Sequence, residues 1–182
     1  MTLTKRNYKK DPKIAGDITP LYLSSFPEDE RPLLEYFYGL VDLNDENEIF
    51  AYYDKSEFVG FTYLTFYKDI VYIFFLAVHP RKRNMGYGSQ ILEDVKKSNN
   101  GKVILLCSEV VDDKYLDNEI RKRRQDFYFR NGFTLNGLKT KENGVIFETM
   151  VYGPHRVSFE DYREIFLLGF GKEADKYLKK ND

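Results

Sequence analysis

The stretch that decides the fold reads IVYIFFLAVHPRKRNMGYGSQIL and spans residues 70–92. Its first nine residues are apolar, which predicts a strand buried on both faces of a sheet. Strict alternation would divide this run between two faces. One face would carry Tyr72, Phe74, Leu76 and Val78, and the other Val71, Ile73, Phe75 and Ala77. Two glycines follow, and helical spacing then begins at residue 87, so the stretch predicts a strand, a tight turn and a helix.

Helices and strands alternate along the rest of the chain, and no linker or repeat interrupts them. We expect a mixed α/β sheet with helices on both faces, in one domain over residues 1–153. A helical extension over 154–182 would pack on this domain or on a second subunit, as in a homodimer. The expected helices cover 14–25, 33–41, 87–98, 117–131 and a segment that begins at Ser158, and the other expected strands cover 3–9, 48–54, 57–67, 102–109, 133–140 and 144–153.

Composition excludes several classes of function. The chain has 182 residues and a net charge of −1, so nothing in its overall charge attracts nucleic acid or a membrane surface. Its longest apolar run has nine residues, whereas a membrane span needs about 20. One cysteine, no apolar leader and two histidines without ligand spacing predict a cytoplasmic protein without a metal site.

The turn at residues 83–89 has the features of an anion site. Backbone N–H groups at a helix N-terminus face outward and carry partial positive charge. Gly86 and Gly88 allow positive φ angles and close approach of a phosphate. A P-loop would need Lys and Ser or Thr after the second glycine, and a dinucleotide fingerprint would need a small residue at Ile91. A plain strand-to-helix turn is the alternative that two glycines alone leave open.

Two sequence motifs, taken together, favour a binding role for the turn over a plain strand-to-helix connection. Arg83, Gly86 and Gly88 match the Arg/Gln-x-x-Gly-x-Gly/Ala signature with which the GNAT superfamily of N-acetyltransferases binds acetyl-CoA. The segment FYFRNGF at 127–133 resembles a second segment of that family, and an apolar strand lies between the two. The resemblance covers about residues 49–152 and implies the GNAT acyl-CoA N-acyltransferase fold.

The resemblance also implies which residues hold the co-substrate. The coenzyme A diphosphate would bind the turn formed by Arg83, Asn84, Met85, Gly86, Tyr87, Gly88 and Ser89. Leu76 and Val78 would lie along the pantetheine arm, where the preceding strand separates from its neighbour. The N–H of Val78 would face the thioester carbonyl and stabilise the negative charge that develops there.

Catalytic roles follow from the same resemblance. Tyr128 matches the family tyrosine, and a phenol, with a pKa of about 10, can protonate the leaving thiolate at neutral pH. The alternative is that Tyr128 only packs in the core. Glu109, at the end of the strand 102–109, is the candidate base for the amine; the alternative is an ordinary surface glutamate.

The resemblance implies an enzyme, an acetyl-CoA-dependent N-acetyltransferase that acts on a primary amine of a small molecule or peptide by direct attack. Since N-terminal helices often wall the acceptor cleft in this fold, the acidic segments 28–30 and 42–48 can attract a cationic amine, although they can equally serve solubility. The alternative function is a non-catalytic acyl-CoA-binding sensor or interaction module.

Overall fold

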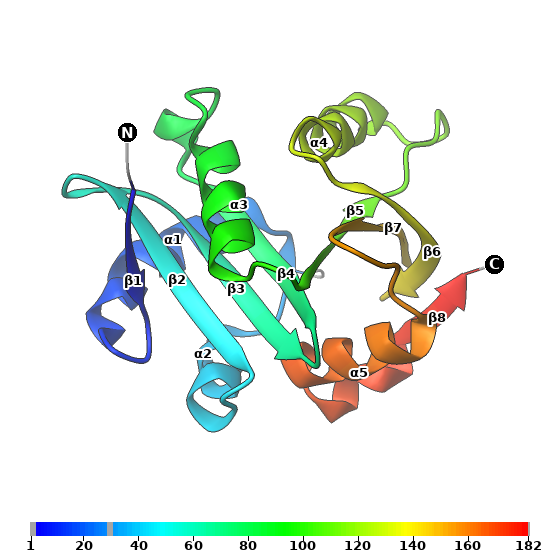
Figure 1. The fold of residues 1–182 in the computed structure, drawn as a ribbon, viewed down its shortest axis with the longest axis horizontal. Helices are drawn as coiled ribbons and strands as arrows, with labels where there is room; N and C mark the ends of the chain where they lie inside the picture. The colour runs from blue at the N-terminus through cyan, green and yellow to red at the C-terminus, as the bar shows by residue number, and fades with distance from the viewer. Residues whose placement is uncertain (1–2, 29–30, 182) are drawn as a thin grey trace.

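A computed structural model describes residues 3–28 and 31–181, so the acidic segment predicted at 28–30 lies largely outside the described residues. The described strands form one eight-stranded sheet with the order β1-β2-β3-β4-β5-β7-β6-β8, which confirms the mixed α/β fold (Figure 1). The pairing is antiparallel except between β4 and β5. The strands are β1 (Thr4–Asn7), β2 (Asn47–Asp54), β3 (Glu57–Tyr67), β4 (Ile70–Val78), β5 (Val103–Glu109), β6 (Thr134–Glu142), β7 (Val145–Tyr152) and β8 (Leu178–Asn181).

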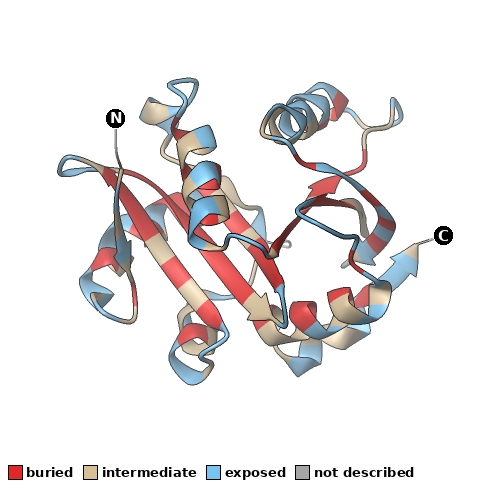
Figure 2. Cartoon of the chain, viewed as in Figure 1, coloured by how far each residue is buried: buried red, intermediate tan, exposed pale blue. Residues whose placement is uncertain are grey.

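Helices cover both faces of the sheet. One face carries α3 (Tyr87–Ser98) and α4 (Asn118–Arg130), whose side chains join a cluster with β3, β4, β5 and β7. The other face carries α1 (Ala15–Ser25) and α2 (Leu34–Leu43) against one half of the sheet and α5 (Phe159–Phe170) against the other. The strands between them are largely buried (Figure 2). Both faces of β4 are therefore covered, as its apolar run predicts.

The pairing between β4 and β5 is short. Only Ile70, Val71 and Tyr72 pair with the first residues of β5, although β4 continues to Val78. Beyond Tyr72 the two strands diverge. Figure 1 shows the two strands diverging, with α3 beside β2–β4 and α4 beside β5–β7; we call the place where they separate the opening between β4 and β5. Among the described residues, no strand lies between β4 and β5 beyond Tyr72, so the backbone groups that face each other there make no ladder hydrogen bonds.

A β-bulge in β4 makes one prediction from the sequence wrong. Tyr63 of β3 pairs with Phe75, but the next residue, Leu64, pairs with Ile73, so Phe74 is an extra residue. One extra residue reverses the alternation of all side chains that follow it. Phe74 and Leu76, expected on the same face, therefore lie on opposite faces: Phe74 packs towards α5, and Leu76 packs with α3 and α4.

The C-terminal segment contributes to the sheet as well as to a helix layer. Ser158 caps α5 by accepting a hydrogen bond from the Asp161 N–H at 3.1 Å, as its capping sequence predicts. Tyr162, Ile165 and Phe166 of α5 are buried against the sheet. The sequence did not predict the last strand, β8, which pairs with β6. The domain boundary at 153/154 remains a prediction.

The start of α2 differs slightly from the prediction. The helix predicted over 33–41 begins at Leu34, since Leu33 is its extended N-cap, and Pro32 therefore precedes the helix and does not lie in its first turn. Within residues 3–28 and 31–181, no helix has the length and apolar character needed to cross a membrane.

Candidate active site

The turn before α3 presents a row of backbone N–H groups without acceptors. Gly86 is the N-cap of α3 and adopts φ +82°, and Asn84 is also left-handed at φ +61°. No side chain of the residues that the structure describes caps this helix. Within the described part of the chain, no acceptor is found for the N–H groups of residues 84–89, which we call the amide turn. An unsatisfied helix N-terminus of this kind is suited to bind an anion.

The residues before the amide turn fix its position. Pro80–Lys82 form a short 3-10 helix that His79 caps through its Nδ1 atom. The N–H of Arg83 donates to the Pro80 carbonyl at 3.3 Å, so Arg83 does not add to the row of available amides. Its exposed side chain reaches back to β4, where Nε lies 3.2 Å from the Val78 carbonyl. Only the remaining donors of its guanidinium can contribute to anion binding.

Side chains of α3 hold the turn against the sheet. Tyr87 is buried, and its hydroxyl donates to Asp54 of the β2–β3 hairpin at 2.7 Å. Ile91, Leu92 and Val95 are almost fully buried, and each such side chain contributes roughly 1.5–3 kcal/mol. In contrast, Asn84, Met85, Gly86 and Ser89 are exposed. The helix is thus anchored on one side while its first amides face solvent.

The two glycines have different physical roles. A Cβ on Gly86 would meet no protein atom within 4 Å, so the fold itself requires Gly86 only for its positive φ angle. A Cβ on Gly88 would lie 3.0 Å from the Phe127 ring of α4 and 3.7 Å from Val78. Gly88 therefore permits close contact between α3, α4 and the end of β4. Leu76 belongs to the same face, so the bulge places both predicted β4 residues beside α3 and α4.

Tyr128 lies on α4 and is half-buried in the cluster between α3, α4 and the sheet. Its ring centroid lies 6.0 Å from that of Phe133. Burial raises the pKa of the Tyr128 phenol, and the nearby Arg124 opposes that increase. Within residues 3–28 and 31–181, the Tyr128 hydroxyl has no hydrogen-bond partner in the structure. A protonated phenol with an available O–H is the form that a general acid requires.

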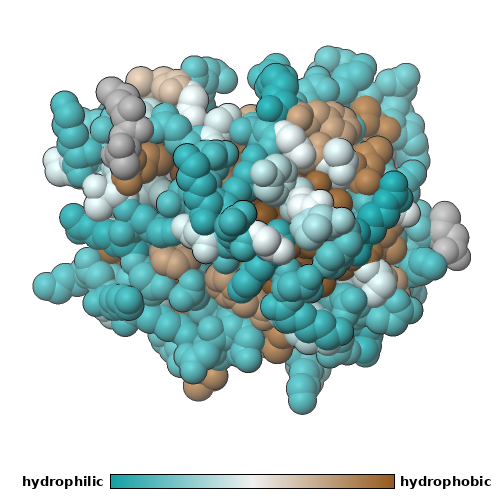
Figure 3. Space-filling model, viewed as in Figure 1, coloured by the Kyte–Doolittle hydropathy of each residue, from teal (hydrophilic) through white to brown (hydrophobic). Residues whose placement is uncertain are grey.

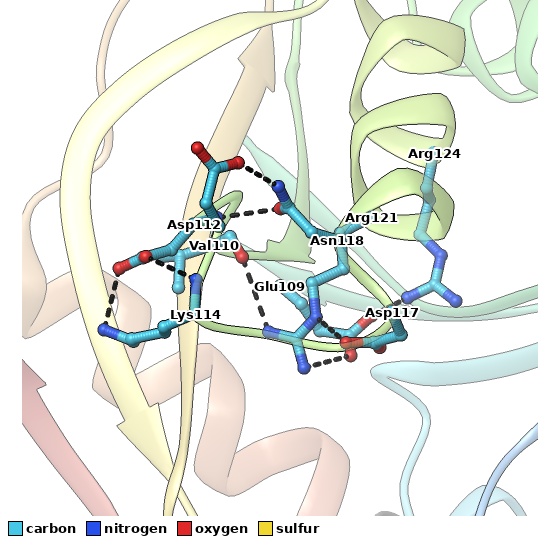
Figure 4. A network of polar contacts seen from close by, with 9 residues as sticks. Glu109, Val110, Asp112, Lys114, Asp117, Asn118, Arg121 and Arg124 are labelled. Carbon is cyan, nitrogen blue, oxygen red and sulfur yellow. Dashed lines mark hydrogen bonds and ion pairs between the residues drawn. The ribbon is translucent and has the colours of Figure 1, made fainter.

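Glu109 is buried, so the alternative of a surface glutamate is wrong. Its carboxylate binds two arginines of α4: Arg124 donates to one oxygen, and Arg121 lies 3.4 Å from the other (Figure 4). Arg121 also donates to Asp117 at 2.9 Å. Figure 4 shows this network at the point where β5 leads into α4. Glu109 can act as a base only if one of these guanidinium groups moves.

Two buried side-chain atoms on this side of the sheet have no partner within the described residues. They are Gln90 Oε1 on α3 and Ser108 Oγ on β5. Ser108 lies two residues after Leu106 and four after Ile104, so it shares the face of β5 on which these residues pack with α3 and α4. Its hydroxyl is therefore on the same side of the sheet as Tyr128. A buried polar atom without a partner costs roughly 1–3 kcal/mol, and a bound ligand can satisfy it. Ser108 was not predicted from the sequence; a serine within an otherwise apolar strand is the signal that could have identified it.

Cys107 is not a candidate nucleophile in this arrangement. Burial raises the pKa of the Cys107 thiol, which keeps it protonated and therefore a poor nucleophile. In the part of the chain that the structure describes, no group of three or more His, Cys, Asp or Glu side chains is placed to bind a metal ion.

Figure 3 shows the near face of the molecule, on which hydrophobic residues gather over α4. Exposed large hydrophobic side chains on or just before α4 are those of Leu116, Ile120 and Phe129. Most of the remaining surface in this view is hydrophilic (Figure 3).

The fold resembles those of proteins with known structures. A GNAT-family protein from Bacteroides thetaiotaomicron has a TM-score of 0.74 and 24% sequence identity, over 94% of this chain and 99% of the other. An aminoglycoside 6'-N-acetyltransferase complexed with coenzyme A has a TM-score of 0.66 and 19% identity, over 84% and 96%. A GNAT acetyltransferase from Elizabethkingia anophelis with acetyl-CoA bound has a TM-score of 0.57 and 17% identity, over 84% and 99%.

A comparison with curated proteins gave no match. The family model described as "Acetyltransferase (GNAT) domain" matches residues 45–135, which is half of the chain and includes both the amide turn and the segment that contains Tyr128. The chain therefore belongs to the GNAT acetyltransferase family.

Proposed function

We propose that the protein is an N-acetyltransferase that transfers an acetyl group from acetyl-CoA to a primary amine. The observation that carries this proposal is the amide turn, whose unsatisfied N–H groups lie beside the opening between β4 and β5. Charge-assisted hydrogen bonds contribute about 1.5–3 kcal/mol each, so several of them can anchor a diphosphate. Ser108 and the backbone of β4 at Leu76 and Val78 supply polar groups further along the opening.

The proposed reaction is a direct transfer. The amine nitrogen forms a bond to the acetyl carbonyl carbon, and the carbon–sulfur bond of the thioester breaks. The Val78 N–H stabilises the carbonyl oxygen as its negative charge grows. Tyr128 gives its proton to the leaving thiolate and recovers a proton from solvent. The nitrogen releases its excess proton, for which Glu109 is the candidate acceptor once Arg124 or Arg121 moves away.

The experiment that tests the function mixes the purified full chain with acetyl-CoA and a panel of amines and follows the release of coenzyme A thiol. We expect thiol release with at least one amine, together with a product heavier by one acetyl group. Tyr128→Phe should reduce kcat by a factor of about 10²–10⁴, the usual contribution of a general acid, without changing the Kd of coenzyme A.

Tyr152→Phe is a matched control. The Tyr152 ring also lies 6.0 Å from Phe133, but this residue is on β7. The control should keep full activity. Binding of acetyl-CoA without turnover over a broad panel would instead support the non-catalytic module, and equal activity of the two variants would remove Tyr128 from the mechanism.

A further inference from the structure

We propose that Ser108 of β5 is a second hydroxyl at the reacting centre, where it donates a hydrogen bond to the sulfur of the co-substrate beside Tyr128. This inference rests on the proposed function and deepens it, because it names the group that holds the thiolate while Tyr128 delivers its proton. Ser108 is 1% exposed, and its Oγ has no hydrogen-bond partner within residues 3–28 and 31–181. Buried polar side chains nearly always have a partner, so one without a partner points to a bound ligand.

Ser108 lies on the separated part of β5. Pairing with β4 ends at Leu105, and each strand residue advances about 3.3 Å, so Ser108 lies roughly 10 Å beyond the last pair. The residue of β4 at the same level is Leu76. It comes four residues after Tyr72, the partner of Leu105, and one of these four is the extra residue of the bulge, which leaves three regular steps on each strand. Ser108 and Leu76 therefore lie opposite each other across the opening between β4 and β5.

The side chain of Ser108 lies on the same side of the sheet as the amide turn. Ile104 and Leu106 of β5 pack in the cluster with α3 and α4, and the alternation of the strand places Ser108 on their face. Leu76 and Tyr128 pack against the same cluster. The Ser108 hydroxyl is thus on the side from which coenzyme A enters the opening in the proposed function.

The Tyr128 hydroxyl lies near this part of β5. Burial has the largest effect on the pKa of the phenol, which it raises; Arg124 opposes this effect, and Cys107 and Glu109 raise the pKa further. Cys107 and Glu109 are the residues on either side of Ser108, so their influence places the phenol close to Ser108. Among the described residues, neither hydroxyl has a hydrogen-bond partner. Two unpaired donors in one place suit a single acceptor atom that lies between them.

The leaving sulfur is an acceptor that needs two donors. The sulfur of a thioester carries little charge, but it becomes a thiolate as the carbon–sulfur bond breaks, so hydrogen bonds to it strengthen during the reaction. Tyr128 transfers its proton to this sulfur, whereas Ser108 keeps its proton and only donates a hydrogen bond. The other donors of the proposed site serve different atoms, since the amide turn holds the diphosphate and the Val78 N–H faces the carbonyl oxygen. Ser108 therefore stabilises the transition state without a change in the bonds that form and break.

The test compares coenzyme A with desulfo-coenzyme A, in which a hydrogen atom replaces the thiol. Calorimetric titrations of the full chain are made at about pH 9, where a thiol with a pKa of about 8.5 is mostly ionised. We expect Ser108→Ala to weaken the binding of coenzyme A at least fivefold and to leave the Kd of desulfo-coenzyme A unchanged. With acetyl-CoA and an amine substrate, the same variant should lower kcat at least tenfold.

Ser25→Ala is the matched control. Ser25 is the last residue of α1, which packs on the other face of the sheet, and its Oγ is also buried without a partner among the described residues. Each replacement removes a buried hydroxyl that the fold does not satisfy, so each should raise the melting temperature of the free protein. Only Ser108→Ala should alter the binding of coenzyme A and kcat.

The outcomes separate this inference from the proposed function. A loss of affinity that depends on the sulfur, without acetylation of any amine, would support the contact of Ser108 and refute the proposed function. Unchanged binding of coenzyme A to Ser108→Ala, or equal weakening of both ligands, would overturn the inference. A melting temperature of Ser108→Ala below that of the unaltered protein would also overturn it, because the fold itself would then use the hydroxyl.

Discussion

Gly88 of α3 and Phe127 of α4 approach each other so closely that a Cβ on Gly88 would lie 3.0 Å from the tip of the Phe127 ring. The two helices pack on neighbouring parts of the sheet on either side of the opening between β4 and β5. Their separation therefore sets the width of the site at its entrance. The second glycine of the turn serves helix packing, whereas the first serves backbone conformation.

Gly88→Ala should force α3 and α4 apart. Overpacking of this kind costs about 1–3 kcal/mol of stability, and we expect weaker coenzyme A binding by severalfold. Phe127→Leu removes the ring tip, so the double variant should recover most of both losses. Urea unfolding and calorimetric titration of the single and double variants measure this coupling. Purely additive effects would show that the contact does not set the helix separation.

Glu109→Gln should destabilise the junction between β5 and α4. The carboxylate is buried and pairs with Arg121 and Arg124, so its neutralisation leaves Arg121 with a weakened partner in a buried position. Loss of one member of a buried ion pair costs about 3–5 kcal/mol. Denaturant unfolding measures this loss directly.

Glu119→Gln is the matched control for that change. Glu119 lies on the same helix but is exposed, and its pair with Lys122 is long at 3.7 Å. Its replacement should alter stability by no more than about 0.5 kcal/mol. If Glu109→Gln were as stable as this control but lost activity with an altered pH profile, a role as base would be favoured over the structural one.

His155 should titrate above the usual value for a histidine. Its Nδ1 bonds the Arg156 carbonyl at 2.9 Å and its Nε2 lies 2.7 Å from Asp69, and both contacts raise its pKa. Because the folded-state pKa is raised, the protonated ring stabilises the fold fully below about pH 6.5, the unfolded value, and this contribution is lost as pH rises through the folded pKa. An NMR titration measures the shift. Asp69→Asn should lower the pKa part of the way back, and an unchanged value would contradict the pairing.

The sequence predicts most of the fold near the amide turn because strong local signals act there. The apolar run of β4, the glycines and the amphipathic α3 each report their own structure through periodicity. The bulge at Phe74 escapes such reasoning, because it arises from pairing with β3 and leaves no mark in an all-apolar run. Consequently the faces of Leu76 and Val78 could not be read from alternation.

The other features that the sequence does not predict also depend on contacts between residues far apart in the chain. Leu178–Asn181 is short and polar, and it becomes a strand only because β6 provides an edge for it. Glu109 was identified from its position at a strand end, but its two arginine partners depend on how α4 packs.

The central claim is that residues 84–89 bind the diphosphate of coenzyme A, and two glycines allow a controlled test. Gly86 and Gly101 both adopt positive φ, +82° and +85°, and a Cβ on either would meet no atom within 4 Å. Gly86 precedes α3, whereas Gly101 follows it. Alanine at either position should therefore cost a similar strain of about 1–2 kcal/mol.

Calorimetric titration of coenzyme A into Gly86→Ala and Gly101→Ala, at a temperature where both are folded, measures the difference. The account predicts that Gly101→Ala binds like the unaltered protein and that Gly86→Ala binds at least tenfold more weakly. Equal affinities of the two variants would contradict it, because the diphosphate would then lie somewhere other than the amide turn.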